Sequence, residues 1–85
     1  MKKFIRLFVT SDICIKHTFI KEIDFFIPST PTIDLYLTSK LSIMVTVYKI
    51  IILNDTVFFD IECPIMPHDT DVTDIAQSGY GWKEI

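Results

Sequence analysis

Isoleucine, valine, threonine and aromatic residues dominate this sequence, and residues that favour helices are scarce. The chain contains 15 Ile, 5 Val and 9 Thr together with 7 Phe and 3 Tyr, but only one Ala and five Leu. β-branched side chains have restricted χ1 angles, which suits them to extended strands more than to helices. The sequence therefore predicts a mainly β (α+β) fold.

The length predicts one small domain, residues 1–85, with a thin core. A chain of this size buries only about 60% of the surface that it exposes when unfolded. The hydrophobic fraction of 49% is sufficient for one core, and it is high for a chain that keeps so much surface exposed. We therefore expect a partner to cover part of the apolar surface, either another protein or a second copy of the chain in a homodimer.

Apolar runs that alternate with polar residues predict about five strands. The turn Asn54-Asp55 separates the last two runs, and both of its residues tolerate positive φ, so a β-hairpin is expected there. A second hairpin is expected around Ser11-Asp12, after which residues 13–16 are again extended. The predicted strands are residues 4–10, 19–27, 33–37, 41–53 and 57–63.

The segment after Pro64 has a different pattern, which predicts a short helix. Asp69 or Thr70 can cap the helix, and Ile75 belongs to its apolar stripe. Gly79 can end the helix, and residues 80–85 can form a final short strand. The expected architecture is a bent antiparallel sheet of about five strands, or a small open barrel, with one short C-terminal helix.

The charge and the apolar runs define the expected environment. With a net charge of −3 and Arg6 as the only arginine, the chain has no basic stripe for nucleic acid. The run 41–53 is too short to span a membrane and contains Lys49. No cleavage site follows the basic N-terminus, so we expect a cytoplasmic protein with no membrane partner. Cys14 and Cys63 are then expected to be reduced and packed as small hydrophobic residues.

Motifs for catalysis or cofactor binding are missing from the sequence. There is no nucleophile elbow and no Ser-His-Asp order, and the two glycines leave no phosphate-binding loop. His17 and His68 are not spaced with the cysteines as metal ligands. We therefore expect no enzyme activity, no cofactor and no metal site.

Two carboxylate pairs are the first candidate binding surface. Glu22 with Asp24, and Asp60 with Glu62, are each two residues apart, so each pair lies on one face of its strand. If the two strands were neighbours, the four carboxylates would form an acidic face that could bind a basic surface. The alternative is a solvated face that only resists aggregation.

Aromatic residues are the second candidate surface. Tyr80 and Trp82, the only tryptophan, are interleaved with Gly79 and Gly81, the only glycines. These side chains either pack over the thin core or anchor an interface, as Trp and Tyr often do. Tyr48, on the polar side of the run 41–53, is a third candidate anchor.

The expected function is non-catalytic protein binding. Small inhibitors and accessory proteins of phages and mobile elements, some acting against a host defence protein, have this size and simplicity. One alternative is a structural or assembly protein that self-associates through residues 41–53. The other is a small SH3-like or OB-like barrel that binds nucleic acid or a small ligand through Tyr36, Tyr48 and Phe58.

Overall fold

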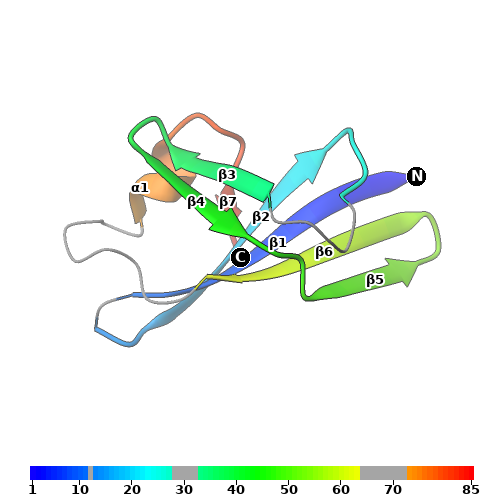
Figure 1. The fold of residues 1–85 in the computed structure, drawn as a ribbon, viewed down its shortest axis with the longest axis horizontal. Coiled ribbons are helices and arrows are strands. Elements are labelled where there is room, and N and C mark those ends of the chain that lie inside the picture. The colour runs from blue at the N-terminus through cyan, green and yellow to red at the C-terminus, as the bar shows by residue number, and fades with distance from the viewer. Residues whose placement is uncertain (12, 28–32, 64–72) are drawn as a thin grey trace.

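The protein is mainly β, as predicted, and its described residues include one very short helix near the C-terminus (Figure 1). A computed structural model describes residues 1–11, 13–27, 33–63 and 73–85. Its elements are β1 (Lys2–Thr10), β2 (Lys16–Ile23), β3 (Ile33–Thr38), β4 (Leu41–Val45), β5 (Lys49–Leu53), β6 (Thr56–Cys63), α1 (Thr73–Gln77) and β7 (Lys83–Glu84).

Five strands form the main sheet, in the order β5-β6-β1-β2-β7, and β3 and β4 form a separate hairpin. The expectation of a wholly antiparallel sheet is wrong, because β1 and β6 run parallel. β1 takes the centre of the sheet, between its hairpin partner β2 and the much later β6. The sheet does not close into a barrel, and β5 and β7 are its edges.

The core lies between the inner face of the main sheet and the β3–β4 hairpin, which crosses over it in Figure 1. Alternate residues of β1 show which face is inner: Ile5, Leu7 and Val9 are only 1%, 0% and 1% exposed. The side chains between them in the sequence point to the opposite face, because direction alternates along a strand. The inner residues of β6, predicted from the same alternation, are all buried: Val57, Phe59, Ile61 and Cys63.

Both predicted hairpins form, but the prediction that residues 13–15 are extended is wrong: they belong to the connection between β1 and β2, where Cys14 has a φ of 65°, and β2 begins only at Lys16. Asn54 adopts a φ of 54° in the turn between β5 and β6, and Leu53 pairs with Thr56 beside it. β1 and β2 pair in antiparallel register from Lys3 with Ile23 to the end of the hairpin. β2 stops at Ile23, so Phe25 is 52% exposed although the alternation placed it on the buried face.

The single strand predicted over residues 41–53 is wrong, because the chain changes sheets within it. β4 pairs with β3, and β5 pairs with β6 in the main sheet. Val45 and Val47 are both 6% exposed, so inward and outward positions keep alternating through the corner. The corner could not be predicted from the sequence, because a strand that passes from one packed sheet to another keeps the same alternation of buried and exposed residues.

The C-terminal segment closes one end of the core. α1 buries Ile75 completely, and Gly79 follows the helix with a φ of 85°, as predicted for its end. The predicted N-cap at Asp69 or Thr70 lies outside the described residues. None of the helices in the described part of the chain has the length and apolar character needed to cross a membrane.

Candidate functional site

The outer face of the main sheet is the strongest candidate surface. The core, with both β3 and β4, lies on the inner face, and the outer face keeps large apolar side chains partly exposed. Cross-strand pairing brings these side chains together, because Phe4 is paired with Phe58 in β6 and Phe58 with Ile51 in β5. We call the following residues the outer patch: Phe4, Phe8, Ile20, Ile51 and Phe58, around the pair Arg6 and Asp60.

An ion pair lies at the centre of the outer patch. Arg6 donates from Nε to Oδ1 and from Nη2 to Oδ2 of Asp60, both at 2.6 Å. The Asp60 side chain is only 4% exposed, whereas the Arg6 side chain is 27% exposed. The parallel register of β1 and β6 sets these residues directly opposite each other, so a carboxylate on a sheet face is neutralised by the neighbouring strand.

Aromatic rings fix the guanidinium of Arg6 further. Its Cζ lies 4.8 Å from the ring centre of Phe58 and 5.8 Å from that of Phe8, within the range of cation–π contacts. Phe4 stacks on Phe58 with ring centres 5.7 Å apart. The hydrogen bonds to Asp60 raise the pKa of Arg6 above its ordinary value, with partial burial opposing the shift. The guanidinium is therefore a fixed charge with a single preferred geometry.

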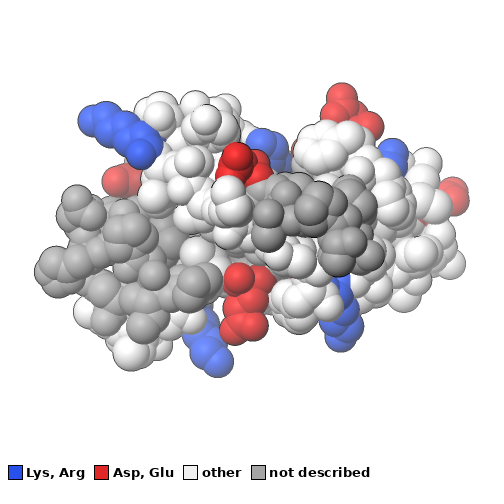
Figure 2. Space-filling model, in the orientation of Figure 1, with Lys and Arg blue, Asp and Glu red and all other residues white. Residues whose placement is uncertain are grey.

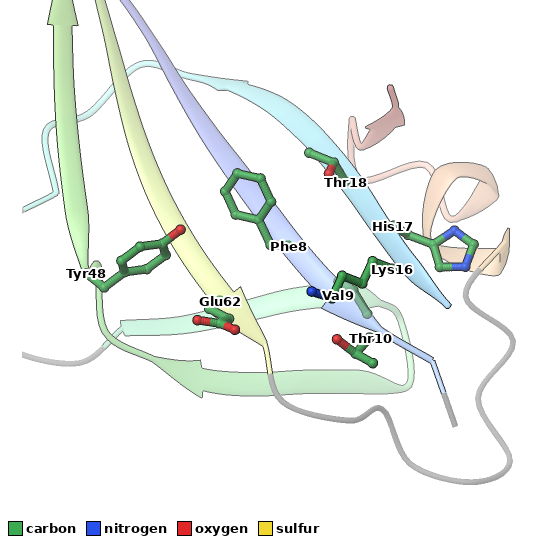
Figure 3. Close-up of a pocket in the computed structure, with 8 residues that line it drawn as sticks. All are labelled: Phe8, Val9, Thr10, Lys16, His17, Thr18, Tyr48 and Glu62. Carbon is green, nitrogen blue, oxygen red and sulfur yellow. The ribbon is translucent and has the colours of Figure 1, made fainter. Parts of the chain in front are cut away.

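A shallow hollow of about 270 Å³ lies beside the outer patch, toward the ends of β1 and β6. Figure 3 shows Phe8, Tyr48 and Glu62 around it, each from a different segment. Lys16 also lines the hollow, and Glu62 has no ion pair with any residue that the structure describes. The hollow thus has aromatic walls with one carboxylate and one ammonium group at its rim.

The four predicted acidic residues do not form one acidic face. β1 lies between β2, which carries Glu22, and β6, which carries Asp60 and Glu62. Asp60 is not solvated as expected, because Arg6 covers and neutralises it. Glu22 and Glu62 are exposed on the outer face, and Asp24 is exposed just beyond β2. In the view of Figure 2 charges of both signs are likewise scattered over uncharged surface.

The three predicted aromatic anchors have different surroundings. Trp82 belongs to the core, where it is 3% exposed and donates its indole N–H to the carbonyl oxygen of Tyr36 at 3.2 Å. Tyr80 is 36% exposed and stacks on the Tyr36 ring. Tyr48 is 57% exposed at the edge of the hollow described above. Only the two tyrosines are therefore accessible to a partner.

Sequence reasoning missed the outer patch, although two signals for it are present. Phe4 and Phe8 share one parity in β1, opposite to the buried positions, so the strand is apolar on both faces. Arg6, the only arginine, lies between them on that same parity. A lone arginine within an apolar strand needs a carboxylate on a neighbouring strand, but the sequence does not say which strand is the neighbour.

The two cysteines differ in accessibility, which gives a first prediction. Cys14 is exposed, contrary to the expectation that both are packed, and Cys63 is a 4% exposed core residue. Burial raises the pKa of the Cys63 thiol, and the thiolate is the reactive form. With Ellman's reagent, only Cys14 should react rapidly in the folded protein, with Cys63 at least roughly tenfold slower until denaturant is added. The variant Cys14→Ser should lose the rapid phase, and two equally fast thiols in the native protein would contradict this structure.

Other chemistry is sparse in the described ranges. His17 pairs through Nδ1 with Glu84 at 2.6 Å, and no three His, Cys, Asp or Glu side chains in this part of the chain lie together as a metal site would require. Comparison of the chain with protein-family models, with curated proteins and with solved structures finds no match in any of the three.

Proposed function

We propose that this chain is a non-catalytic protein-binding module and that the outer patch is its contact surface. The observation that supports the proposal is a partly exposed aromatic sheet face with a fixed arginine at its centre. Aromatic residues and arginine are enriched at the centres of protein interfaces, where they bury much area with few torsions to fix.

The outer patch is well organised for binding before any partner arrives. Two hydrogen bonds and two rings hold Arg6, so binding would cost little side-chain entropy there. Charged residues of both signs surround the apolar centre on the outer parity of the strands: Lys2, Glu22, Lys49 and Glu62. A partner with an apolar centre and a rim of mixed charge fits this arrangement better than the uniformly basic partner that an acidic face would have required.

A role as an inhibitor or accessory protein is part of the proposal. A domain of 85 residues acts most simply by occupying a surface of a larger protein, and the outer patch is suited to that. Aromatic side chains on an open sheet can also stack on the bases of a single strand. The net charge of −3, together with Glu22 and Glu62 on the same face, favours the protein partner.

The test is capture of a partner from a lysate of the native host, with variants that alter only the outer patch. Phe8→Thr and Phe58→Thr should each weaken capture about tenfold, the effect expected of a hot-spot residue. Met44→Thr is the matched control, because Met44 is 70% exposed on β4, away from the main sheet. All variants are first checked for native circular dichroism and a cooperative thermal transition.

Two results would contradict this proposal. The first is a wild-type protein that retains no partner, or variants of the outer patch that retain it as well as the wild type does. The second is tight binding to a single-stranded oligonucleotide that weakens steeply with salt, since phosphate contacts release counterions and show this dependence.

A further inference from the structure

We propose that β5 is a dimerisation edge, to which β5 of a second copy of this chain adds in antiparallel orientation. This inference goes beyond the proposed function and does not depend on it. The apolar sequence of β5 conflicts with its position at the edge of the sheet. Residues 50–53 of Lys49–Leu53 are apolar on both faces of the strand, which is typical of a strand whose two faces are both covered. Among the residues that the structure describes, β5 instead lies at an edge of the sheet, where β6 is its one neighbour.

Two apolar side chains of β5 are exposed to solvent. Ile52 is 61% exposed and Leu53 is 58% exposed, one on each face of the strand. Figure 1 shows β5 along one margin of the molecule, at the outside of the main sheet. Edge strands are normally protected by charge, proline or shortness, because their unpaired backbone groups recruit other strands. In β5 the only such protection is Lys49, at the first position.

The opposite edge of the same sheet is protected. β7 has only two residues, Lys83 and Glu84, both charged and both exposed. It pairs with β2 at just Phe19 and Ile20. Beyond these two residues, β2 carries Lys16, Lys21 and Glu22. This edge therefore has the charged residues that protect an edge strand, and β5 has only Lys49, so we expect a further strand to pair with β5.

The backbone of β5 is in the right phase for a further strand. Leu53 pairs with Thr56 next to the two-residue turn, and such closing pairs exchange hydrogen bonds within the hairpin. Hydrogen-bonded and non-bonded pairs then alternate, so Ile50 and Ile52 direct their N–H and C=O groups away from β6. Two residues with outward donors and acceptors allow four hydrogen bonds across a two-fold axis.

The strand is complementary to itself, which identifies a second copy as the occupant. Full antiparallel overlap places Ile51 opposite the partner's Ile51, and Ile50 opposite the partner's Ile52. Lys49 then lies opposite the partner's Leu53, so the two lysines are kept at opposite ends of the paired strands. The symmetry repeats each of these contacts, as a C2 interface requires.

Such pairing would join the two main sheets into one. Residues directly opposite each other share a face, so the outer patches of both copies would lie on the same side. Ile51 is a member of the outer patch and would lie on the two-fold axis. The dimer would then present one continuous aromatic face in place of two separate ones.

The first experiment measures mass by light scattering as a function of protein concentration. The wild type should dimerise, and Ile52→Lys should raise the dissociation constant at least tenfold by placing a charge at the edge. Ile13→Lys is the matched control, because Ile13 is 70% exposed and lies outside the strands. A wild type that stays monomeric at millimolar concentration, or an Ile52→Lys variant that dimerises like the wild type, would overturn the inference.

The second experiment tests the register. In a Cys14→Ser background, Ile51→Cys should form a disulfide-linked dimer under mild oxidation, because the two cysteines face each other across the axis. Ile52→Cys should link much less, and stronger linking at residue 52 would overturn this arrangement. If the wild type is monomeric but Ile52→Lys loses a captured protein, β5 pairs with that protein and the second copy is excluded. Phe8→Thr leaves β5 unchanged, so failure of the proposed function is distinguished from failure of this inference.

Discussion

Replacing Trp82 by alanine is expected to lower the free energy of unfolding by about 3–4 kcal/mol, within the range for large aromatic core residues. The side chain is 3% exposed, and its indole N–H donates to the Tyr36 carbonyl oxygen at 3.2 Å. Together with the stacking of Tyr80 on Tyr36, this contact packs the last residues of the chain against β3. A domain of this size has a total stability on the order of 5–10 kcal/mol, so this one change should remove a large part of it.

Urea denaturation followed by far-ultraviolet circular dichroism measures the effect, since the variant lacks the only tryptophan and gives no tryptophan fluorescence. Trp82→Phe retains most of the ring but leaves the carbonyl oxygen of Tyr36 without its donor, which should cost about 1–2 kcal/mol. Tyr80→Ala is the neighbouring control and should cost less than about 1 kcal/mol, because Tyr80 is 36% exposed. Equal losses for Tyr80→Ala and Trp82→Ala would contradict the position of Trp82 in the core.

Local features of the fold could be predicted from the sequence because their causes are local. The turn at Asn54-Asp55 needs residues that tolerate positive φ, and Asn54 adopts that conformation. The inner face of β6 follows from alternation within a single strand. Gly79 follows the helical segment with a positive φ, and it could be predicted there because glycine adopts positive φ readily.

Pairing between distant strands could not be predicted, because alternation does not identify a neighbour. The parallel pairing of β1 with β6 joins residues more than fifty positions apart, such as Arg6 and Asp60. The predicted acidic face depended on β2 and β6 being adjacent, and β1 separates them. The outer patch was missed for the same reason, since Phe4 and Phe58 become neighbours only through that pairing.

Whether a strand lies at the edge or in the centre of a sheet could not be predicted from its sequence either. The run Lys49–Leu53 has the composition of a central strand but occupies an edge. In a monomer this is a liability, because the apolar side chains and backbone groups at the edge remain unpaired. In a dimer paired through β5 the same composition is consistent with its surroundings. Because local sequence usually agrees with the environment of the folded chain, this mismatch between the sequence of β5 and its edge position supports a dimer.

The ion pair between Arg6 and Asp60 at the centre of the outer patch is expected to contribute to stability. Arg6→Met should lower the free energy of unfolding by about 2–3 kcal/mol, because it leaves the carboxylate of Asp60, 4% exposed, without a counter-charge. The cost is below that of a fully buried pair, since the Arg6 side chain is 27% exposed and water can enter. Asp60→Leu should cost about 1–2 kcal/mol, because the guanidinium can still reach solvent and keeps its two rings.

The double variant Arg6→Met with Asp60→Leu separates a role of this ion pair in stability from a role in partner binding. Because apolar residues of similar volume can replace a buried ion pair at little cost, the double variant should lose less than about 1 kcal/mol and be more stable than Arg6→Met alone. The coupling energy should be the same at pH 7 and pH 10, since the raised pKa of Arg6 means that this contribution is lost only as the pH rises above the ordinary range for arginine.

A double variant that is folded and stable then isolates the role of the pair in binding. If Arg6 is a contact residue, partner capture should fall about tenfold in the double variant even though the fold is intact. If capture is unchanged, Asp60 serves only to neutralise Arg6 on the aromatic sheet face. The aromatic rings of the outer patch then account for binding without the ion pair. Losses in both single variants that simply add in the double variant would contradict a direct interaction between Arg6 and Asp60.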